Sequence, residues 1–241
     1  MIIRASVLML IVMSLLGCSS VASHHHSVIG QKHFATGQYE AADSAFRAAV
    51  ERDPQNTDAQ VMLGWSLFKL GKHQESLSAF EKLPTVTPAS VDALTGVAWN
   101  YFKLQRYEDA GVTFRKIAEL DPSVPDVYSG FGWLEFVAGR YDEAIANFQK
   151  ALIRAPGDAD AYRGIGFSHV AANRAQAALQ PLKKALWREP KWDDVLAKLG
   201  TVYMKLERYE EAERAYRAVL SRDPRSAEAL EGLAALELKK K

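Results

Sequence analysis

The apolar residues of this chain recur at the spacing of one face of an α-helix, and the whole pattern returns every 34 residues. In residues 141–156, within one of the copies, this face carries Ala144, Phe148, Ala151 and Leu152. A second helical stripe lies ahead of it in the same copy and carries Tyr128, Phe131 and Gly132. Each copy therefore predicts two antiparallel helices. Since one helix pair cannot bury its own apolar face, the copies are expected to stack.

Residues 23–226 divide into six blocks of 34 residues with no insertion: 23–56, 57–90, 91–124, 125–158, 159–192 and 193–226. Positions are counted below from the first residue of each block. Position 32 is always proline, which cannot continue a helix: Pro54, Pro88, Pro122, Pro156, Pro190 and Pro224. Position 8 is always small: Gly30, Gly64, Ala98, Gly132, Gly166 and Gly200. Position 24 is always large and apolar: Phe46, Phe80, Phe114, Phe148, Leu182 and Tyr216.

This set of positions resembles the tetratricopeptide repeat (TPR), and its phase never slips between residues 23 and 226. The resemblance implies an all-α, right-handed superhelical solenoid of helix–turn–helix repeats, with the six repeats occupying residues 27–226. Residues 227–241 restart the pattern of a first helix, and no second helix follows. We therefore expect a C-terminal capping helix with a basic tail.

Four features depart from the repeat pattern. The first helix of block one is polar, which predicts either fraying or an N-terminal cap. Pro84 is expected to shorten the second helix of block two, and Pro181 to kink that of block five. Glu135 stands at position 11, where the stripe calls for an apolar residue, and the sequence alone gives no reason for it.

The N-terminal residues have the pattern of a secretion signal. Residues 1–4 carry one positive charge, and the apolar run of residues 5–16 is too short to span a membrane. Residues 15–18 read Leu-Leu-Gly-Cys, which resembles the lipobox of bacterial lipoproteins. The resemblance implies that residues 1–17 are a removed signal peptide and that lipid such as palmitate is attached to Cys18. It further implies an anchor in the outer membrane, facing the periplasm. The alternative is an ordinary secretory signal with a chance cysteine.

After the lipobox, residues 18–26 are expected to form a short polar tether between the lipid and the repeats. The tether ends in His24, His25 and His26, and histidine-rich tracts can bind metals. A solvated tether, or the first turn of a helix, explains the three histidines without a metal. We therefore expect no metal site here.

Composition and charge narrow the classes of function. The 241 residues carry a net charge of +1 with both signs interleaved, unlike a nucleic-acid-binding protein, and the single cysteine excludes an intrachain disulfide. Gly-x-Gly triplets at residues 130–132 and 164–166 lie in predicted helices with no strand ahead, so they are not phosphate loops. His33, His73 and His169 lie in separate blocks, without metal-ligand spacing or an adjacent nucleophile. We expect no enzymatic activity and no cofactor.

Candidate functional residues lie on the face of the first helix that lines the concave surface of TPR arrays. Position 9 is aromatic in four successive blocks: Trp65, Trp99, Trp133 and Phe167. Position 6 is glycine in three blocks, at a cost of roughly 1 kcal/mol each relative to alanine: Gly96, Gly130 and Gly164. One interpretation is a groove with tryptophan walls, in which the glycines leave room for a partner chain. The other is that each tryptophan packs over the glycine of the neighbouring helix.

Two rows of charge accompany these residues. Position 2 is acidic from the second block onward: Asp58, Asp92, Asp126, Asp160, Asp194 and Glu228. Position 16 is basic over the same blocks: Lys72, Arg106, Arg140, Arg174 and Arg208. The rows could flank the groove, with Asp92, Asp126 and Asp160 selecting basic side chains of a partner. They could also follow from helix-end electrostatics, with acids at N-termini and bases at C-termini.

The sequence therefore predicts a non-enzymatic, membrane-anchored scaffold that binds an envelope protein or peptide in its concave groove. Pilus or secretin biogenesis is favoured among the envelope pathways, because lipoproteins of that type resemble this chain in having about six repeats. Two alternatives stay open. The tryptophans could stack on sugar rings in a polysaccharide-export system, or identical chains could assemble into a coat.

Overall fold

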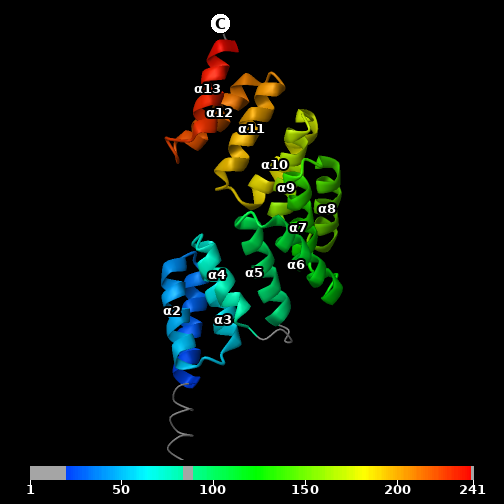
Figure 1. Ribbon diagram of the computed structural model, residues 1–241. Coiled ribbons are helices and arrows are strands. Elements are labelled where there is room, and N and C mark those ends of the chain that lie inside the picture. The colour runs from blue at the N-terminus through cyan, green and yellow to red at the C-terminus, as the bar shows by residue number, and fades with distance from the viewer. Residues whose placement is uncertain (1–19, 84–88, 240–241) are drawn as a thin grey trace, which may run out of the picture. The chain divides into compact units, whose positions relative to one another are not determined.

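The computed structural model describes residues 20–83 and 89–239 (Figure 1). All regular secondary structure in these residues is helical, which confirms the all-α prediction. The chain divides into two compact units, one ending at Asp121 and the other beginning at Pro122. The predicted signal peptide, Cys18 and the last two lysines lie outside the described residues. No helix within the described ranges is both long and apolar enough to cross a membrane.

The first unit contains a helix at residues 20–35 and five further helices: α2 (Tyr39–Arg52), α3 (Thr57–Lys69), α4 (His73–Glu81), α5 (Ala89–Lys103) and α6 (Tyr107–Leu120). The second unit contains α7 (Pro125–Val137), α8 (Tyr141–Arg154), α9 (Ala159–Ala171), α10 (Ala175–Arg188), α11 (Asp193–Lys205), α12 (Tyr209–Leu220) and α13 (Ala227–Lys239). The second helix of every pair begins at position 17 of its block. The helices are therefore in phase with the 34-residue period.

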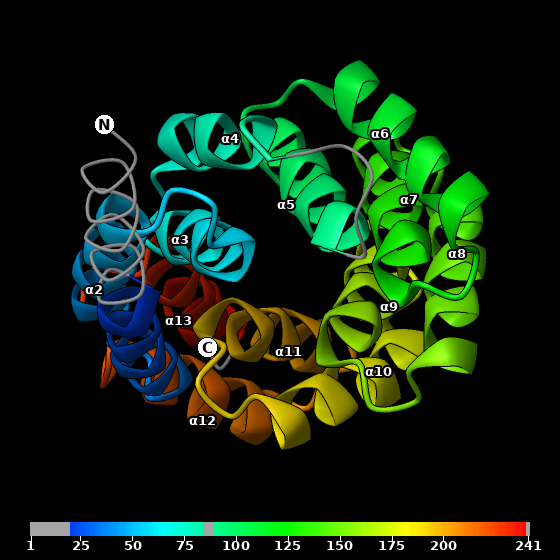
Figure 2. The same ribbon diagram turned by 90° about the horizontal axis from the view of Figure 1, so that it is seen from below.

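Within each unit the helices form two layers. In the second unit, α7, α9, α11 and α13 are the first helices of their pairs, and each contacts the next one along the chain. The second helices α8, α10 and α12 form the other layer (Figure 2). Each of them contacts the first helix before it and the first helix after it. Each second helix of this unit is therefore held between two first helices.

The position-24 side chain fills the space between those two first helices. Phe148 of α8 is fully buried, and its ring lies against Gly132 of α7 and Gly164 of α9. A Cβ added at Gly132 would stand 2.7 Å from the ring, and one at Gly164 would stand 2.2 Å from it. Both distances are shorter than real carbon contacts, so only glycine fits. The same arrangement recurs for Phe80 with Gly64 and Gly96, and for Tyr216 with Gly200 and Gly232.

The turn between the two helices of a pair requires a left-handed backbone at position 15. Its φ lies between 59° and 77° in all six pairs. Glycine supplies this conformation without strain at Gly37, Gly71 and Gly139. The other three turns place Gln105, Asn173 and Glu207 there, and of these only asparagine is well suited to it.

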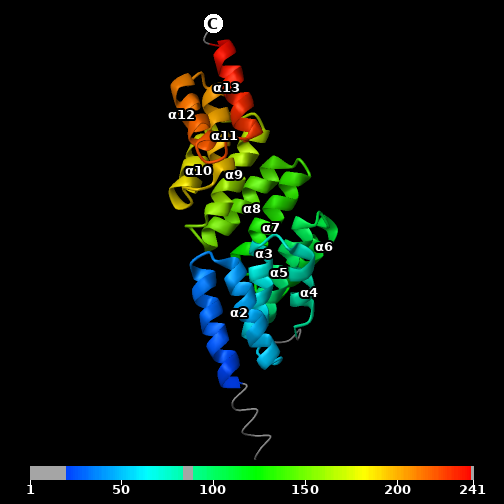
Figure 3. The same ribbon diagram turned by 90° about the vertical axis from the view of Figure 1, so that its left-hand side faces the viewer.

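The N-terminal end of the repeats differs from the expected polar tether. Residues 20–35 form one helix that lies beside α2 (Figure 3). The buried Ser23 hydroxyl donates to the backbone carbonyl of Ala49 at 2.8 Å, and the Asn56 amide donates to Ser23 at 3.0 Å and to Ser27 at 3.3 Å. These polar side chains therefore replace the apolar contacts of the later repeats, and residues 20–26 belong to the folded array.

The predicted proline effects differ between the two helices. The helix α4 ends at Glu81 and has 9 residues, whereas α8 has 14, so the shortening before Pro84 is observed. Pro84 itself lies outside the described residues. By contrast, α10 runs from Ala175 to Arg188 with Pro181 inside it, and the kink expected at this proline stays a prediction.

The last helix, α13, packs on α11 and α12 through Ala229 and Leu236. Its other side is not covered by a following helix in the described residues. Leu230 is 49% exposed and Leu238 is 75% exposed on that side. The predicted cap is therefore present as a helix, but part of its outer surface is apolar.

We expect Glu207→Gly to raise the free energy of unfolding by about 0.5–1 kcal/mol. Glycine removes the steric cost of the left-handed backbone, and the added freedom of the unfolded chain offsets part of that gain. Urea-induced unfolding measures the change. Glu207→Ala is the control, because it removes the same side chain and keeps the Cβ atom. Equal stabilities of the two variants would contradict the argument.

Candidate partner-binding surface

The position-9 tryptophans make hydrogen bonds across repeat boundaries. The Trp133 indole N–H donates to a carboxylate oxygen of Asp160 at 2.6 Å. In the first unit, the Trp65 indole N–H donates to Asp92 at 2.9 Å. Each acceptor is the position-2 residue of the following repeat, 27 residues further along the chain. The acidic row and the aromatic row, which the sequence presents separately, are therefore one structural feature.

The indole rings also pack within their own repeat. The Trp133 ring meets Phe136 and Phe148 edge to face, with centroid distances of 5.5 and 5.2 Å. Trp65 and Trp99 make the matching pairs with the phenylalanines at positions 12 and 24 of their repeats. Trp133 is 8% exposed, and Trp65 is half-buried. These rings are therefore packed by aromatic contacts of their own repeat.

The position-6 glycines do not leave an open space between the tryptophans. Gly96 lies against the Phe80 ring, and Gly164 lies against the Phe148 ring. Gly130 is buried in α7. The interpretation that these glycines make room for a partner is therefore corrected at Gly96 and Gly164, where an aromatic ring of the second-helix layer already fills that room.

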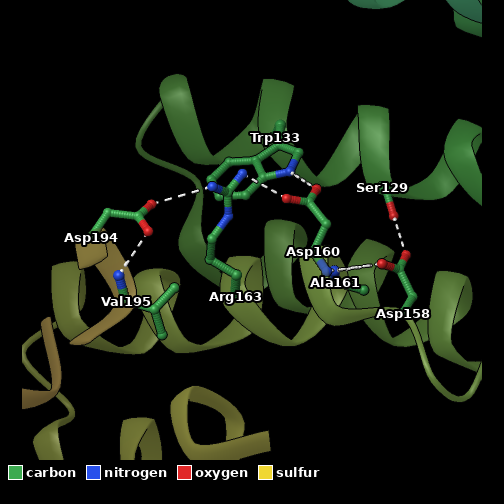
Figure 4. A network of polar contacts seen from close by, with 8 residues as sticks. All are labelled: Ser129, Trp133, Asp158, Asp160, Ala161, Arg163, Asp194 and Val195. Atoms are coloured by element: carbon green, nitrogen blue, oxygen red, sulfur yellow. Dashed lines mark hydrogen bonds and ion pairs between the residues drawn. The ribbon is translucent and has the colours of Figure 1, made fainter. Parts of the chain in front are cut away.

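Arg163 of α9 joins two repeat boundaries of the second unit (Figure 4). Its guanidinium lies 2.6 Å from a carboxylate oxygen of Asp160 and 3.2 Å from one of Asp194. It also stacks between two indoles, at 5.0 Å from the Trp133 ring centre and 4.8 Å from that of Trp192. At the next boundary, position 9 is Phe167, which has no N–H group to donate to Asp194. Arg163 is the partner of this carboxylate instead.

The last boundary of this unit uses other groups at the same positions. The Thr201 hydroxyl at position 9 donates to Glu228 at position 2 of the next block, at 3.2 Å. The Lys198 ammonium donates to the same carboxylate at 2.8 Å. An acid at position 2 thus accepts from the preceding first helix at all three boundaries of the second unit.

Beside this cluster, Asp158 caps the N-terminus of α9. Its carboxylate accepts from the backbone N–H groups of Asp160 and Ala161 and from the Ser129 hydroxyl (Figure 4). Burial raises the pKa of Asp158 above its usual value, and these hydrogen bonds oppose the rise. The capping contacts fix the start of α9, and with it the place of Asp160 in the first turn.

The position-16 bases lie in the turn between the two helices of a pair, where the Arg140 N–H donates to the Glu135 carbonyl of the first helix at 2.9 Å. Arg106, Arg140 and Arg208 are each the residue before a second helix, where a positive charge opposes the helix dipole. Acids in the first turn offset this: Arg106 pairs with Asp109 at 2.8 Å, and Arg208 pairs with Glu211. Position 16 is thus next to both a helix C-terminus and a helix N-terminus, and the helix-end explanation of this row stays a prediction.

Glu135, at position 11, lies opposite the base at position 16, which explains why an acid stands in the apolar stripe. The Glu135 carboxylate pairs with Arg140. In other repeats a tyrosine takes its place, and the guanidinium of Arg106 lies 4.4 Å from the ring centre of Tyr101. Block five places His169 at this position, opposite Arg174. The Nδ1 atom of His169 is buried without a hydrogen-bond partner in the described chain, and burial together with Arg174 lowers its pKa.

A buried polar network in the first unit was not foreseen from the sequence. Asn100 is fully buried, and its amide donates to the Ser76 hydroxyl at 2.8 Å and to the Gly96 carbonyl at 2.9 Å. The Asn100 side-chain oxygen lies 3.2 Å from Nδ1 of His73, and burial lowers the pKa of this histidine. Each polar group of Asn100 is satisfied internally, which indicates a structural role.

Two hollows in the first unit lie away from the tryptophan surface. One of about 300 Å³ lies between α2, α3 and α4, and one of about 270 Å³ lies between α4, α5 and α6. None of the predicted partner-binding residues lines either of them. Among the described residues, no group of three or more His, Cys, Asp or Glu side chains is placed to hold a metal ion.

A family model of the tetratricopeptide repeat matches residues 28–90, 62–125, 130–194 and 197–241. The matches cover well over half of the sequence, and this chain therefore belongs to the tetratricopeptide-repeat family. No curated protein matches the chain significantly. The repeat assignment thus comes from the helix phase and the family model together.

Three solved structures illustrate the fold. A chain of the APC/C hetero-tetramer Cut9–Hcn1 is 18% identical with a TM-score of 0.80, over 89% of this chain and 42% of that one. PilF of Pseudomonas aeruginosa is 17% identical with a TM-score of 0.68, over 90% of this chain and 99% of that one. PilW, described as a type IV pilus biogenesis factor, is 18% identical with a TM-score of 0.69, over 88% and 98%. At these identities the likeness shows the fold alone.

We expect a double-mutant cycle of Trp133→Phe and Asp160→Ala to give a coupling energy of about 1–3 kcal/mol, because the indole donates to a charged acceptor. Phenylalanine retains most of the ring packing and removes the donor. Urea unfolding of the four proteins measures the coupling. The matched cycle with Phe136→Leu in place of Trp133→Phe serves as the control. A coupling near zero for Trp133 would show that the hydrogen bond adds nothing to stability.

Proposed function

We propose that this protein is a non-enzymatic scaffold, held at the outer membrane by lipid on Cys18, that binds a protein partner on its first-helix layer for pilus assembly. The observation that carries the proposal is the Trp–Asp link, which Trp65 makes with Asp92 in the first unit and Trp133 makes with Asp160 in the second. Each link holds an indole ring and a first-turn carboxylate in place on two neighbouring first helices. Pre-ordered side chains lose little freedom on binding, which favours recognition.

The pathway is supported by the structural likeness to PilF and PilW, which extends over 98–99% of those chains and about nine-tenths of this one. The anchor is supported by the Leu-Leu-Gly-Cys sequence of residues 15–18. The family itself supports a partner-binding scaffold over an enzyme, since stacked TPR helices serve as extended binding surfaces.

The chemistry of the surface favours a partner with basic side chains. Asp92 and Asp194 each lie in the first turn of a first helix and are exposed to solvent. The Asp194 side chain is 49% exposed, although it pairs with Arg163. A carboxylate held in this way attracts an approaching lysine or arginine, and repels an acidic partner.

The burial of Trp133 argues against the polysaccharide alternative at that site. A sugar ring stacks on an open aromatic face, and only 8% of Trp133 is exposed. Its remaining surface is covered by aromatic edges and by the Arg163 guanidinium. A protein partner that contacts the carboxylates and the edges of the rings needs no such open face.

A pull-down from envelope extract tests partner binding. We expect Asp194→Lys to reduce recovery of the bound envelope proteins roughly tenfold, because like charges across an interface are costly. Glu143→Lys is the matched control, since Glu143 also lies in the first turn of a helix but belongs to the second-helix layer. Undiminished recovery with Asp194→Lys, or equal losses with both variants, would refute this binding surface.

The anchor has a separate test. We expect Cys18→Ser to move the protein from the membrane fraction to the soluble periplasmic fraction, since the lipid would have no attachment site. Immunoblotting of separated membranes and periplasm measures the distribution. Retention of the variant in the outer-membrane fraction would show that Cys18 does not hold the chain there.

A further inference from the structure

Two large apolar side chains project from the second-helix layer of the second unit. Ile153, at the end of α8, is 77% exposed, and Trp187, at the end of α10, is 74% exposed. Both occupy position 29 of their blocks, and the blocks are consecutive. The turn after α8 also approaches the end of α10, since the Arg188 guanidinium lies 3.2–3.4 Å from the place of a Cβ atom at Gly157. The two projecting side chains therefore occupy equivalent places on the same edge of the second-helix layer.

Basic side chains surround these two residues. Lys150 and Lys184 each lie three residues before one of them, which is the spacing of neighbours on a helix face. Arg188 lies 4.6 Å from the ring centre of Trp187, and Lys191 follows in the next turn. The helix α10 contains no acidic residue. We name this set the basic-apolar edge: Lys150, Ile153, Lys184, Trp187, Arg188 and Lys191.

Few opposing charges lie on this edge. Glu189 is exposed beside it, and Asp158 is engaged in capping α9. Arg154, the other base at the end of α8, donates to the Pro122 carbonyl at 3.0 Å and stacks on Tyr128 at 3.8 Å. The edge therefore keeps a local excess of positive charge around an exposed indole.

We propose that the basic-apolar edge docks the second unit onto an anionic lipid bilayer. Tryptophan is favoured at the boundary between lipid and water, where its ring is buried and its N–H stays hydrated. Lysine and arginine near the surface are attracted by anionic headgroups. Both apolar side chains are largely exposed and have bases beside them, which is the combination that binds an anionic bilayer surface. The proposal does not depend on the partner surface or on Cys18.

The test measures tryptophan fluorescence of the full chain with vesicles of phosphatidylglycerol that carry brominated acyl chains, which quench an indole only on contact. Trp187→Phe isolates the signal of Trp187 from the other four tryptophans. We expect strong quenching in the wild type and clearly weaker quenching in Trp187→Phe. The apolar N-terminal residues can hold either protein on the vesicle, so the difference reports the edge itself.

The second part of the test asks whether binding depends on the charge of the lipid and of the edge. We expect the Trp187 quenching to fall at least threefold with phosphatidylcholine vesicles, and likewise in the triple variant Lys150→Gln, Lys184→Gln, Lys191→Gln. The control is Val112→Ser with Leu120→Ser, which removes exposed apolar side chains of α6 and should leave the signal unchanged. Equal quenching in the wild type and in Trp187→Phe, or equal quenching by both lipids, would overturn the proposal. Either result leaves the envelope pull-down unaffected, so the two proposals fail separately.

Discussion

The arrangement depends on one steric constraint: in three repeats, the large ring at position 24 of the second helix leaves room only for glycine on the first helices at either side. Phe148 occupies the place that a Cβ atom would take at Gly132 and at Gly164. The ring is shared by two repeats, so neither repeat completes its core alone. This is the physical reason why the stability of such arrays comes from neighbours as much as from each pair. It also sets the closeness of successive first helices.

Close first helices make the polar links across repeat boundaries possible. Once α7 and α9 are brought together by Phe148, the indole of Trp133 can reach the first-turn carboxylate of Asp160. The acid is favoured there by the helix dipole as well, so one residue serves two interactions. Arg163 then extends the link to Asp194. Packing of the second-helix rings thus positions charged groups on the first-helix layer, where a partner can reach them.

The sequence predicts the helices well because their signals are local and repeat, and it predicts their contacts less well. Proline at position 32 and the small residue at position 8 are visible in every block. The Trp–Asp link joins residues 27 positions apart, and its signal is the constant offset between Trp65 and Asp92 and between Trp133 and Asp160. The space at Gly96 and Gly164 is likewise not predictable from local sequence, since the ring that fills it belongs to the preceding block. The serines of residues 20–27 carry no apolar pattern that could indicate a packed helix.

The bond between Trp133 and Asp160 has a consequence for observing the protein in motion. Indole emission responds to nearby charge and to the state of its N–H group, and this indole touches a carboxylate and a guanidinium of the next repeat. A rotation of one repeat against the other must change both contacts at once. The following boundary has an indole of its own, since Trp192 lies 4.8 Å from the same guanidinium, so Trp192→Phe is needed to isolate the Trp133 signal. The fluorescence of Trp133 can therefore report motion of α9 relative to α7 in the second unit.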